Sequence, residues 1–447
     1  MNKISTEHQR YVTDFQEFTK ILNSTDPPWL KEKRETALNH FCELGFPTAR
    51  RNNENWKYTN VSPIAKTPFI YQQHANINGV NLSDIKRIAP WQSNWINLVF
   101  VDGHYSEALS TPLMHTNKIQ VINLHEAIDL HTDLLEKTLG VYASSNYDGF
   151  LALNTAFIRD GAFVNIQEGE QIDSPIQLLF ISTGKATPTI SHPRIIIMAD
   201  AMSKASIVET YIGISQNRYF TNSVSEIILG ENAEIQHDRI LLESENAFHI
   251  GMSRVHQSNK STFSSRSFSK GSTLGRHDLL VSLDGNESSC YLNGLYITSN
   301  TQHMDHFINI NHIKPHTKSR LYYKGILADK SKAVFGGTVW VQKNAQKTDA
   351  IQKDMNLLLS SDAEIDSKPA LFIYADDVQC GHGATSGNID EETLFYMRSR
   401  GIDLETASHL LIYGFANEII ETTKNKHLNN YLTKHFLETL PAHKFEF

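Results

Sequence analysis

The feature that most constrains the fold is a long central segment, residues 156–389, in which almost no 3.6-residue periodicity occurs. Short β-rich runs recur through it instead, and turn-forming segments such as QEGEQ, GENAE, DGNES and SSDAE separate them. Strands of this kind must pair with one another, so the segment predicts a large, mainly β core. The runs are AFVNI, IQLLFI, RIIIM, SIVETYI, VSEIIL, RILLE, DLLVSL, YLNGLYIT, RLYYKGIL, TVWVQ, MNLLLS and ALFIYA.

Two kinds of arrangement can bury so many short strands. A sandwich or barrel needs antiparallel pairs, but tight Asn-Gly turns are scarce, and Asn293-Gly294 lies inside a strand-like run. In a solenoid each coil stacks on the previous one, and neighbouring coils share a core. Ala-Glu-Ile occurs at 233–235 and 363–365, each time after a turn and before an apolar run, which indicates a loose repeat without one exact period. The pattern alone leaves parallel β-helix, sandwich and barrel open.

Helical patterns precede this core. Apolar residues recur at helical spacing in residues 6–22, and residues 30–44 predict a second helix that ends at Gly45. Further on, WINLVFVDG at residues 95–103 predicts a strand that ends at a turn.

Helical patterns also follow the core. Asp390 is expected to cap a helix over 391–400, and Gly401 to end it. Asp403 starts another helix that is apolar around much of its circumference and therefore needs partners on two sides. One side is expected to be the body of the protein, and the other a second protein or its own helices. The predicted regions are 1–155 (N-terminal helical or mixed), 156–390 (β core) and 391–447 (C-terminal helical).

Composition excludes several classes of function. The net charge is −8 and the basic residues are scattered, with only short clusters at 31–34 and 50–51, which argues against nucleic-acid binding. No apolar stretch approaches the ~18 residues that span a bilayer, and the N-terminus lacks the apolar core of a secretory signal. Cys42, Cys290 and Cys380 are odd in number and far apart, as in a reducing compartment, so a cytoplasmic location is expected.

Common catalytic motifs are missing from the sequence. It has no Walker-type phosphate loop, no Gly-x-Gly-x-x-Gly after a strand and no Gly-x-Ser-x-Gly elbow. Ser267 to Lys270 matches Ser-x-x-Lys, a pattern that four common letters often produce by chance. The densest histidine cluster is interpreted as surface or structural, because His303 and His306 would point to opposite faces of a strand. Its members are His303, His306, His312 and His316.

Cys380-Gly381-His382 is the most informative short motif. In an extended strand, residues two apart project from one face, so the thiol and the imidazole would meet at one point. That geometry suits iron or zinc, and it also suits a thiolate stabilised by an imidazolium. Two ligands do not close a tetrahedral site, and a second polypeptide could supply the others. The remaining alternative is a buried, inert cysteine beside a turn histidine.

Longer stretches resemble the SufB/SufD family of the SUF iron–sulfur cluster assembly machinery, and the resemblance covers nearly the whole chain. The segment Trp56-Lys57-Tyr58-Thr59 favours the SufD side of the family over its paralogue SufB. The matching stretches are RNNENWKYTNV (51–61), KTDAIQKDMNLLLS (347–360), ALFIYADDVQCGHGATSGNIDEETLFYMRSRGI (370–402) and ASHLLIYGFANEII (407–420).

The resemblance implies a right-handed parallel β-helix flanked by helical regions. It also implies a non-hydrolytic scaffold that pairs with SufB through the β-helix and binds the SufC ATPase through its C-terminal helices. Cys380 and His382 would then help to hold a transient iron–sulfur cluster, or iron, at the interface with SufB. Gly381 stands where related sequences often have serine, so the backbone would orient these ligands less firmly. Reduced flavin is also linked to such complexes, but no motif locates a flavin site.

Two other functions stay open. One is a stand-alone thiol enzyme with Cys380 as nucleophile and His382 as base. The other is a purely structural partner of SufB in which the motif is dispensable. The uncovered terminal strands of a β-helix favour pairing with some partner, and a homodimer of the chain alone stays open.

Overall fold

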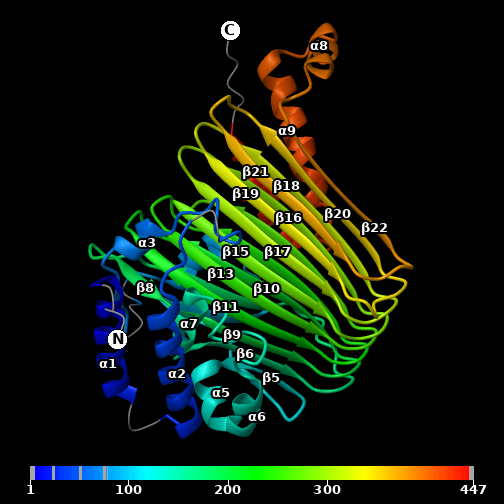
Figure 1. Ribbon diagram of the computed structural model, residues 1–447. Helices are drawn as coiled ribbons and strands as arrows, with labels where there is room; N and C mark the ends of the chain where they lie inside the picture. Colours follow the sequence, from blue (N-terminus) through cyan, green and yellow to red (C-terminus); the bar gives the residue numbers. More distant parts are fainter. Residues whose placement is uncertain (1–5, 23–25, 50–52, 74–76, 78, 442–447) are drawn as a thin grey trace.

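The β-rich runs of the central segment pair in parallel, each with the strand two further along the chain (Figure 1). This computed structural model describes residues 6–22, 26–49, 53–73, 77 and 79–441. Successive strands alternate between a 12-stranded and a 10-stranded sheet, which together form a parallel β-solenoid of about eight turns. The expected fold class, a mainly β protein with a parallel β-helix core flanked by helical regions, is confirmed.

The strands of the coils are long and regular. In the 12-stranded sheet they are β6 (Gly161–Ile166), β9 (Arg194–Ala199), β11 (Tyr219–Leu229), β13 (Phe248–Gln257), β15 (Leu274–Leu283), β17 (His303–His312), β19 (Lys332–Val341) and β21 (Glu364–Ile373). In the 10-stranded sheet they are β7 (Ile176–Ser182), β10 (Lys204–Gly213), β12 (Glu234–Leu242), β14 (Thr262–Lys270), β16 (Ser289–Thr298), β18 (Lys318–Leu327), β20 (Asp349–Leu358) and β22 (Gln379–Gly387). The short β8 (Thr189–Ser191) and β1 (Ile70–Tyr71) add to the 12-stranded sheet beside β11.

The coils repeat with a nearly constant length. Along the 10-stranded sheet from β10 to β22, equivalent residues of successive strands are 27 to 31 positions apart. Because the pairing is parallel, a side chain that faces inward in one coil lies over an inward-facing side chain of the next. The variable length explains why the sequence shows no exact period.

Recurring corner chemistry connects the two sheets. A non-glycine residue with positive φ lies two or three positions before most strands of the later coils, such as Asn232 (φ 56°) before β12. A small buried residue follows it, and its hydroxyl donates a hydrogen bond of 2.7–2.8 Å to the carbonyl three residues earlier at Ser203, Ser261, Ser288 and Ser331. Ala233 occupies such a corner, and Ala363 keeps the same backbone bond to the carbonyl three residues earlier without a positive-φ residue before it. The repeated Ala-Glu-Ile therefore marks the entry into β12 and β21.

The inner surface of the β-helix is partly polar. Glu209 is 1% exposed, and its carboxylate accepts hydrogen bonds from Tyr211 and Ser225 and contacts His237 at 3.1 Å. Four core strands, β13, β14, β17 and β22, are not among the runs singled out from the sequence. The sequences of β13, β14 and β17 contain many polar residues, because buried positions in these strands carry hydrogen-bonded polar groups. β22 is rich in glycine and has no buried residue.

The N-terminal part adds both helices and strands. The expected helices are confirmed as α1 (Thr6–Leu22) and α2 (Pro28–Leu44), the latter ending at Gly45 with φ 62°. The expected strand at 95–103 is β2 (Ile96–Val101), which pairs in parallel with β7 and starts the 10-stranded sheet. The other elements are α3 (Ser62–Lys66), α4 (Leu82–Ile88), β3 (His104–Tyr105), η1 (Glu107–Leu109), β4 (Met114–His115), β5 (Ile119–Asn123), α5 (Leu124–Leu130), α6 (Thr132–Thr138) and α7 (Gly149–Ala156).

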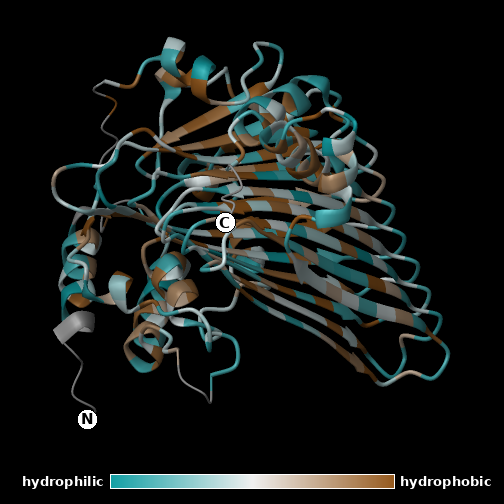
Figure 2. Ribbon diagram, turned by 90° about the horizontal axis from the view of Figure 1, so that it is seen from above, coloured by the Kyte–Doolittle hydropathy of each residue, from teal (hydrophilic) through white to brown (hydrophobic). Residues whose placement is uncertain are grey.

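The C-terminal helices first project from the body and then return to cover part of the 10-stranded sheet. Helix α8 (Glu391–Ser399) is capped by Asp390 and α9 (Leu404–Ile420) by Asp403, as expected. One face of α9 packs on β16 and β18, where Lys324 donates to the carbonyl of Phe415 at 3.0 Å. Helix α8 projects beyond the coils (Figure 1). The helices α10 (Lys426–Leu432) and η2 (Thr433–Leu437) complete this layer, in which apolar residues are prominent (Figure 2).

The corner geometry yields a stability prediction. Replacing Asn232 by Val should lower the free energy of unfolding by about 1–2 kcal/mol, because a β-branched side chain is strained at positive φ. Asn232→Gly should leave stability almost unchanged, since glycine adopts this conformation without strain. Urea unfolding midpoints measure both effects, and Glu231→Val is the matched exposed control. Equal midpoints for Asn232→Val and Asn232→Gly would contradict the account of the corners.

Candidate metal-binding site at the open end of the β-helix

Cys380 and His382 lie on β22, the last strand of the 10-stranded sheet. The alternative of a buried cysteine beside a turn histidine is wrong about the turn, because His382 lies within Gln379–Gly387, a strand paired in parallel with β20. Cys380 is half-buried and His382 is exposed. The strand contains glycine at 381, 383 and 387 and lacks large apolar residues, so its sequence alone has weak strand propensity.

The register assigns both side chains to one face. Cys380 is opposite Ala350 and His382 is opposite Gln352, and both of these β20 residues are buried in the interior. Gly381 belongs to the other face, where an added Cβ would lie 3.6 Å from Cδ1 of Ile351. The thiol and the imidazole therefore continue the inward-facing rows of the lower coils to the end of the stack.

The electrostatics of Cys380 are those of a neutral thiol. Burial raises its pKa above the ordinary value and the negative charge of Asp349 raises it further, while a backbone hydrogen bond from Ala350 acts in the opposite direction. A nucleophilic cysteine needs a lowered pKa. This observation counts against the stand-alone thiol enzyme in the isolated chain.

The donor set at this end is incomplete for a metal ion. A thiolate sulfur and an imidazole nitrogen suit iron or zinc, but a closed site takes four ligands. No group of three His, Cys, Asp or Glu side chains that could hold a metal ion occurs among the described residues. Any metal bound at Cys380 and His382 therefore needs further ligands from outside the part of the chain that the structure covers.

The strands at this end are uncovered. β21 pairs only with β19 and β22 only with β20, so each has one backbone edge without a strand partner in the described structure. Near the end of β21, Phe372, Ile373 and Tyr374 are all at least 40% exposed. Long edges beside apolar side chains are surfaces that proteins normally cover by pairing.

The Trp-Lys-Tyr-Thr segment has a structural role that the sequence did not reveal. Trp56 is buried, donates to Asp148 at 3.2 Å and stacks on the guanidinium of Arg276 at 3.9 Å. The Thr59 hydroxyl donates to Asp305, and an ion pair joins Glu54 to Lys368 on β21. The segment thus fastens the N-terminal part to the outer face of the last coils. Arg51 and Asn52 of the matching stretch lie outside the described residues.

The other candidates from the sequence are structural. His306 and His312 are buried in the interior, and burial lowers the pKa of each to about 3. His303 lies on the opposite face of β17, as expected, and contacts Thr59. Ser267 is buried, whereas Lys270 reaches the carbonyl of Thr439, so the two do not meet as a catalytic pair.

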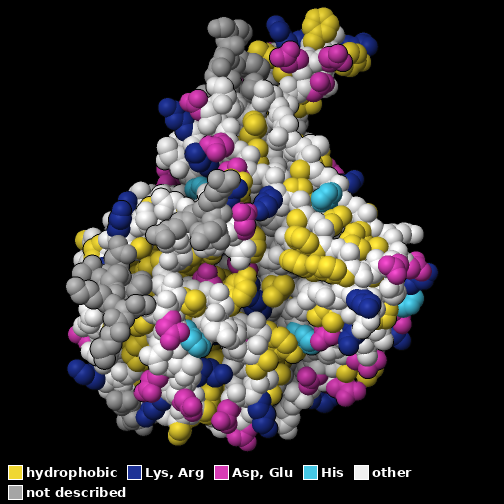
Figure 3. All heavy atoms as spheres, viewed as in Figure 1, with side chains coloured by type: hydrophobic (Ala, Val, Ile, Leu, Met, Phe, Trp, Pro, Cys, Tyr) yellow, Lys and Arg dark blue, Asp and Glu magenta, His cyan; other side chains and the backbone are white. Residues whose placement is uncertain are grey.

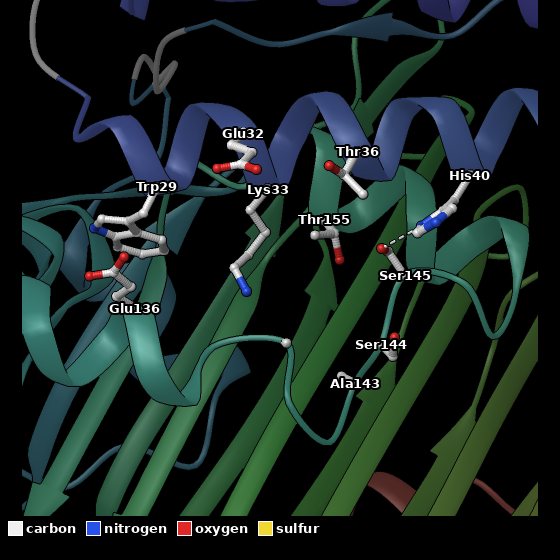
Figure 4. Close-up of a pocket in the computed structure, with 11 residues that line it drawn as sticks. Trp29, Glu32, Lys33, Thr36, His40, Glu136, Ala143, Ser144, Ser145 and Thr155 are labelled. Atoms are coloured by element: carbon white, nitrogen blue, oxygen red, sulfur yellow. Dashed lines mark hydrogen bonds between the residues drawn. The ribbon is translucent and has the colours of Figure 1, made fainter.

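A cavity of about 420 Å³ lies between α2 and the segment after α6 (Figure 4). The Lys33 ammonium points into it and donates to the carbonyl of Leu139 at 2.8 Å, and burial lowers the pKa of this lysine. The His40 ring contacts the Ser145 hydroxyl at 2.8 Å. Within the described residues no carboxylate is hydrogen-bonded to His40, so this contact lacks the third group of a nucleophile–base triad. It ties α2 to the segment across the cavity.

The geometry defines a class of protein: a parallel β-helix whose last coil is open and presents a thiol and an imidazole on one face. Two family models match the chain. Residues 5–178 match the SufBD protein N-terminal region, and residues 180–415 match the SufBD core domain of SUF-system FeS cluster assembly. The chain therefore belongs to the SufBD family.

Comparison with individual relatives indicates which members of the SufBD family the chain resembles. The chain is 30% identical to the iron–sulfur cluster assembly protein SufD of Escherichia coli over 91% of its own length and 92% of that protein's. It is 32% identical to a SufBD family protein of Synechocystis over 90% and 89%, and 27% identical to SufD of Bacillus subtilis over 94% of both chains. It is thus a SufD-like member of the SUF system. No helix among the described residues combines the length and apolar character needed to cross a membrane.

The raised pKa of Cys380 gives a testable pH dependence. In a Cys42→Ser background, the rate of alkylation of Cys380 by iodoacetamide should keep rising through pH 9, because only the thiolate reacts and an ordinary thiol has a pKa of about 8.5. Cys290 is fully buried and should not contribute. Mass spectrometry of the alkylated site measures the rate, and Cys42→Ser/Cys380→Ser is the control. A plateau reached below pH 7.5 would show a thiolate–imidazolium pair instead.

Proposed function

We propose that the chain is a non-hydrolytic scaffold subunit of the SUF iron–sulfur assembly complex. It pairs with SufB through the open end of its β-helix, forms the nascent-cluster site at that interface, and binds the SufC ATPase through its C-terminal helices. The observation that carries the proposal is that Cys380 and His382 share the inward face of an uncovered terminal strand. The family membership supports the reaction class, which is iron–sulfur cluster assembly.

Pairing through the open end follows from backbone chemistry. The backbone N–H of Gln379 donates to the carbonyl of Thr348, the residue just before β20. In a parallel strand the alternate residues, among them Cys380, His382 and Ala384, then direct their backbone N–H groups away from β20. A second β-helix that adds to this edge would satisfy these groups and bring its own ligands to Cys380 and His382. The same edge supports a homodimer when the chain is alone.

The C-terminal region supports a second binding surface. Phe395 and Tyr396 on α8 are 74% and 58% exposed, and Leu410 on α9 is 48% exposed. Apolar side chains gather at the projecting tip in Figure 3. Exposed aromatic residues of this kind are common in protein interfaces. The sequence has no phosphate loop of its own, so ATP hydrolysis in the complex is assigned to SufC.

The remaining parts of the proposal come from the family resemblance and from the patterns in the sequence. The cluster is a transient cargo of Cys380 and His382 and not a resident cofactor. The division at residues 155 and 390 and a cytoplasmic location belong to the same proposal. Reduced flavin as a component of the complex also stays a prediction, and no described residues are assigned to it. The purely structural partner is the competing function.

The role of His382 separates the two functions. His382→Ala, co-expressed with SufB and SufC, should lower the iron and sulfide content of the purified complex at least about tenfold while all three subunits still co-purify. His316→Asn is the matched control, because His316 is exposed at a coil corner with φ 58°. Colorimetric iron and sulfide assays measure the outcome. Unchanged content in an intact complex would support the purely structural role.

The edge of β22 gives a test of pairing. Ala384→Pro removes one backbone donor that faces away from β20, so it should weaken co-purification with SufB while leaving the isolated chain folded. Ala384→Val keeps the donor and should pair normally. Phe395→Asp, on the distant α8, should leave SufB pairing intact and weaken SufC binding. Normal SufB pairing by Ala384→Pro would contradict an interface at this edge.

A further inference from the structure

The cavity of about 420 Å³ between α2 and the segment after α6 has a lysine that points into it (Figure 4). Lys33 reaches the cavity from α2, and its side-chain nitrogen donates to the carbonyl of Leu139 at 2.8 Å. Gly140, with φ 80°, lies beside this nitrogen, and a side chain there would begin 3.6 Å from Nζ of Lys33. Glycine at this position therefore leaves the nitrogen open toward the cavity.

The surroundings of Lys33 favour its neutral form. Burial lowers the pKa of this lysine, the negative charge of Glu226 acts in the opposite direction, and the positive charge of Arg194 lowers the pKa further. The carboxylate of Glu226 is already neutralised, because Arg194 lies 2.6 Å away and two backbone N–H groups donate to it. A neutral amine is a nucleophile, whereas an ammonium ion has no lone pair to share.

Hydroxyl groups line the rest of the cavity. The hydroxyl of Thr155 accepts a hydrogen bond from Arg194 at 3.3 Å, so its own proton can be donated to a ligand. The hydroxyl of Ser145 lies 2.8 Å from Nδ1 of His40. Such groups bond to the hydroxyl and carbonyl oxygens of a ligand. The hydroxyl residues that line the cavity are Thr36, Ser144, Ser145 and Thr155.

The charges at the cavity favour a neutral ligand. Glu32 and Glu136 line it with exposed carboxylates, so together with Lys33 they give an added anion no net attraction. The ring of Trp29 also borders the cavity, and its indole N–H donates to the Thr132 hydroxyl at 2.9 Å, which holds the ring in place. The C–H groups of a small ligand can pack against such a ring.

We propose that this cavity binds small neutral hydroxyaldehydes and hydroxyketones, and that Lys33 forms an imine with their carbonyl carbon. The neutral amine nitrogen attacks the carbonyl carbon. The carbonyl oxygen then leaves as water with the two hydrogens of the amine, so that a C=N bond replaces the C=O bond. The hydroxyl groups of the ligand bond to Thr36, Ser145 and Thr155. The step uses neither Cys380 nor His382, so the inference stands apart from the proposed scaffold function.

The probe for this site is glyceraldehyde, trapped on the full chain by sodium cyanoborohydride, which reduces the imine to a stable secondary amine. At pH 7, Lys33 should be labelled at least about three times faster than Lys137, an exposed lysine of α6, because a lowered pKa leaves more neutral amine. The ratio should fall as the pH rises toward about 10, where ordinary lysines lose their protons as well. Peptide mass spectrometry measures both rates.

The binding step has its own test. Labelling of Lys33 should saturate with the glyceraldehyde concentration, whereas labelling of Lys137 should rise in proportion to it. Thr36→Val should raise the half-saturating concentration about fivefold, the loss expected for one hydrogen bond. Thr13→Val, which changes an exposed threonine of α1 outside the cavity, is the matched control and should behave as the wild type does.

The proposal is overturned by any of four results. These are labelling of Lys33 no faster than that of Lys137, labelling of Lys33 that does not saturate, an unchanged half-saturating concentration in a folded Thr36→Val variant, and stronger labelling by glyceraldehyde 3-phosphate than by glyceraldehyde. The last result would mean that the cavity selects an anion. Thermal unfolding verifies folding, and because Thr36 is exposed its replacement should leave the melting temperature nearly unchanged.

Discussion

The hydrogen-bonded stacking of each coil on the one below is the constraint on which the rest of the structure depends. Parallel registry passes the inward or outward direction of a side chain from coil to coil, so Cys380 inherits its direction from Ala350 and His382 from Gln352. The same stacking has no natural end. The last strands remain open unless another chain covers them, and the candidate metal ligands lie on the strand where the stacking stops. The candidate site and the proposed interface are therefore two consequences of one geometry.

A polar interior makes this stacking specific. Buried ion pairs such as Arg194–Glu226, with nitrogen and oxygen 2.6 Å apart, contribute little net stability because both ions lose their hydration. Each buried ion pair forms only when both side chains lie at the correct positions in neighbouring strands, however. Glu226 also accepts backbone N–H groups from Gly140 and Ala143, so one carboxylate joins the β-helix to the N-terminal part. A slip of one residue would turn such groups to the wrong face and leave them unpaired, which penalises alternative registers.

The N-terminal segment around Trp56 shows how a short motif can serve two purposes. It fastens the N-terminal helices to coils far along the chain, because Trp56 and Thr59 contact Arg276 and Asp305. It also lines one side of a cavity of about 290 Å³ over the outer face of β17, β19 and β21.

The sequence by itself determined a mainly β core, the helical ends with their caps, and the motif that carries the thiol and the imidazole. These features are local: apolar runs, turn residues, Asp390 and Asp403 before helices, and an i, i+2 spacing that acts whenever the chain is extended. Strands β13, β14 and β17 escaped prediction because their polar residues are satisfied by neighbours 24 to 37 positions away, as in the contact of His277 with Ser253 and of His306 with Ser269. Only the tertiary structure decided which face of the sheet Cys380 and His382 occupy and that their strand has an open edge. It also decided that the guanidinium of Arg276 stacks on Trp56. Those facts depend on the pairing of distant segments, and that pairing is set by the summed packing of all coils.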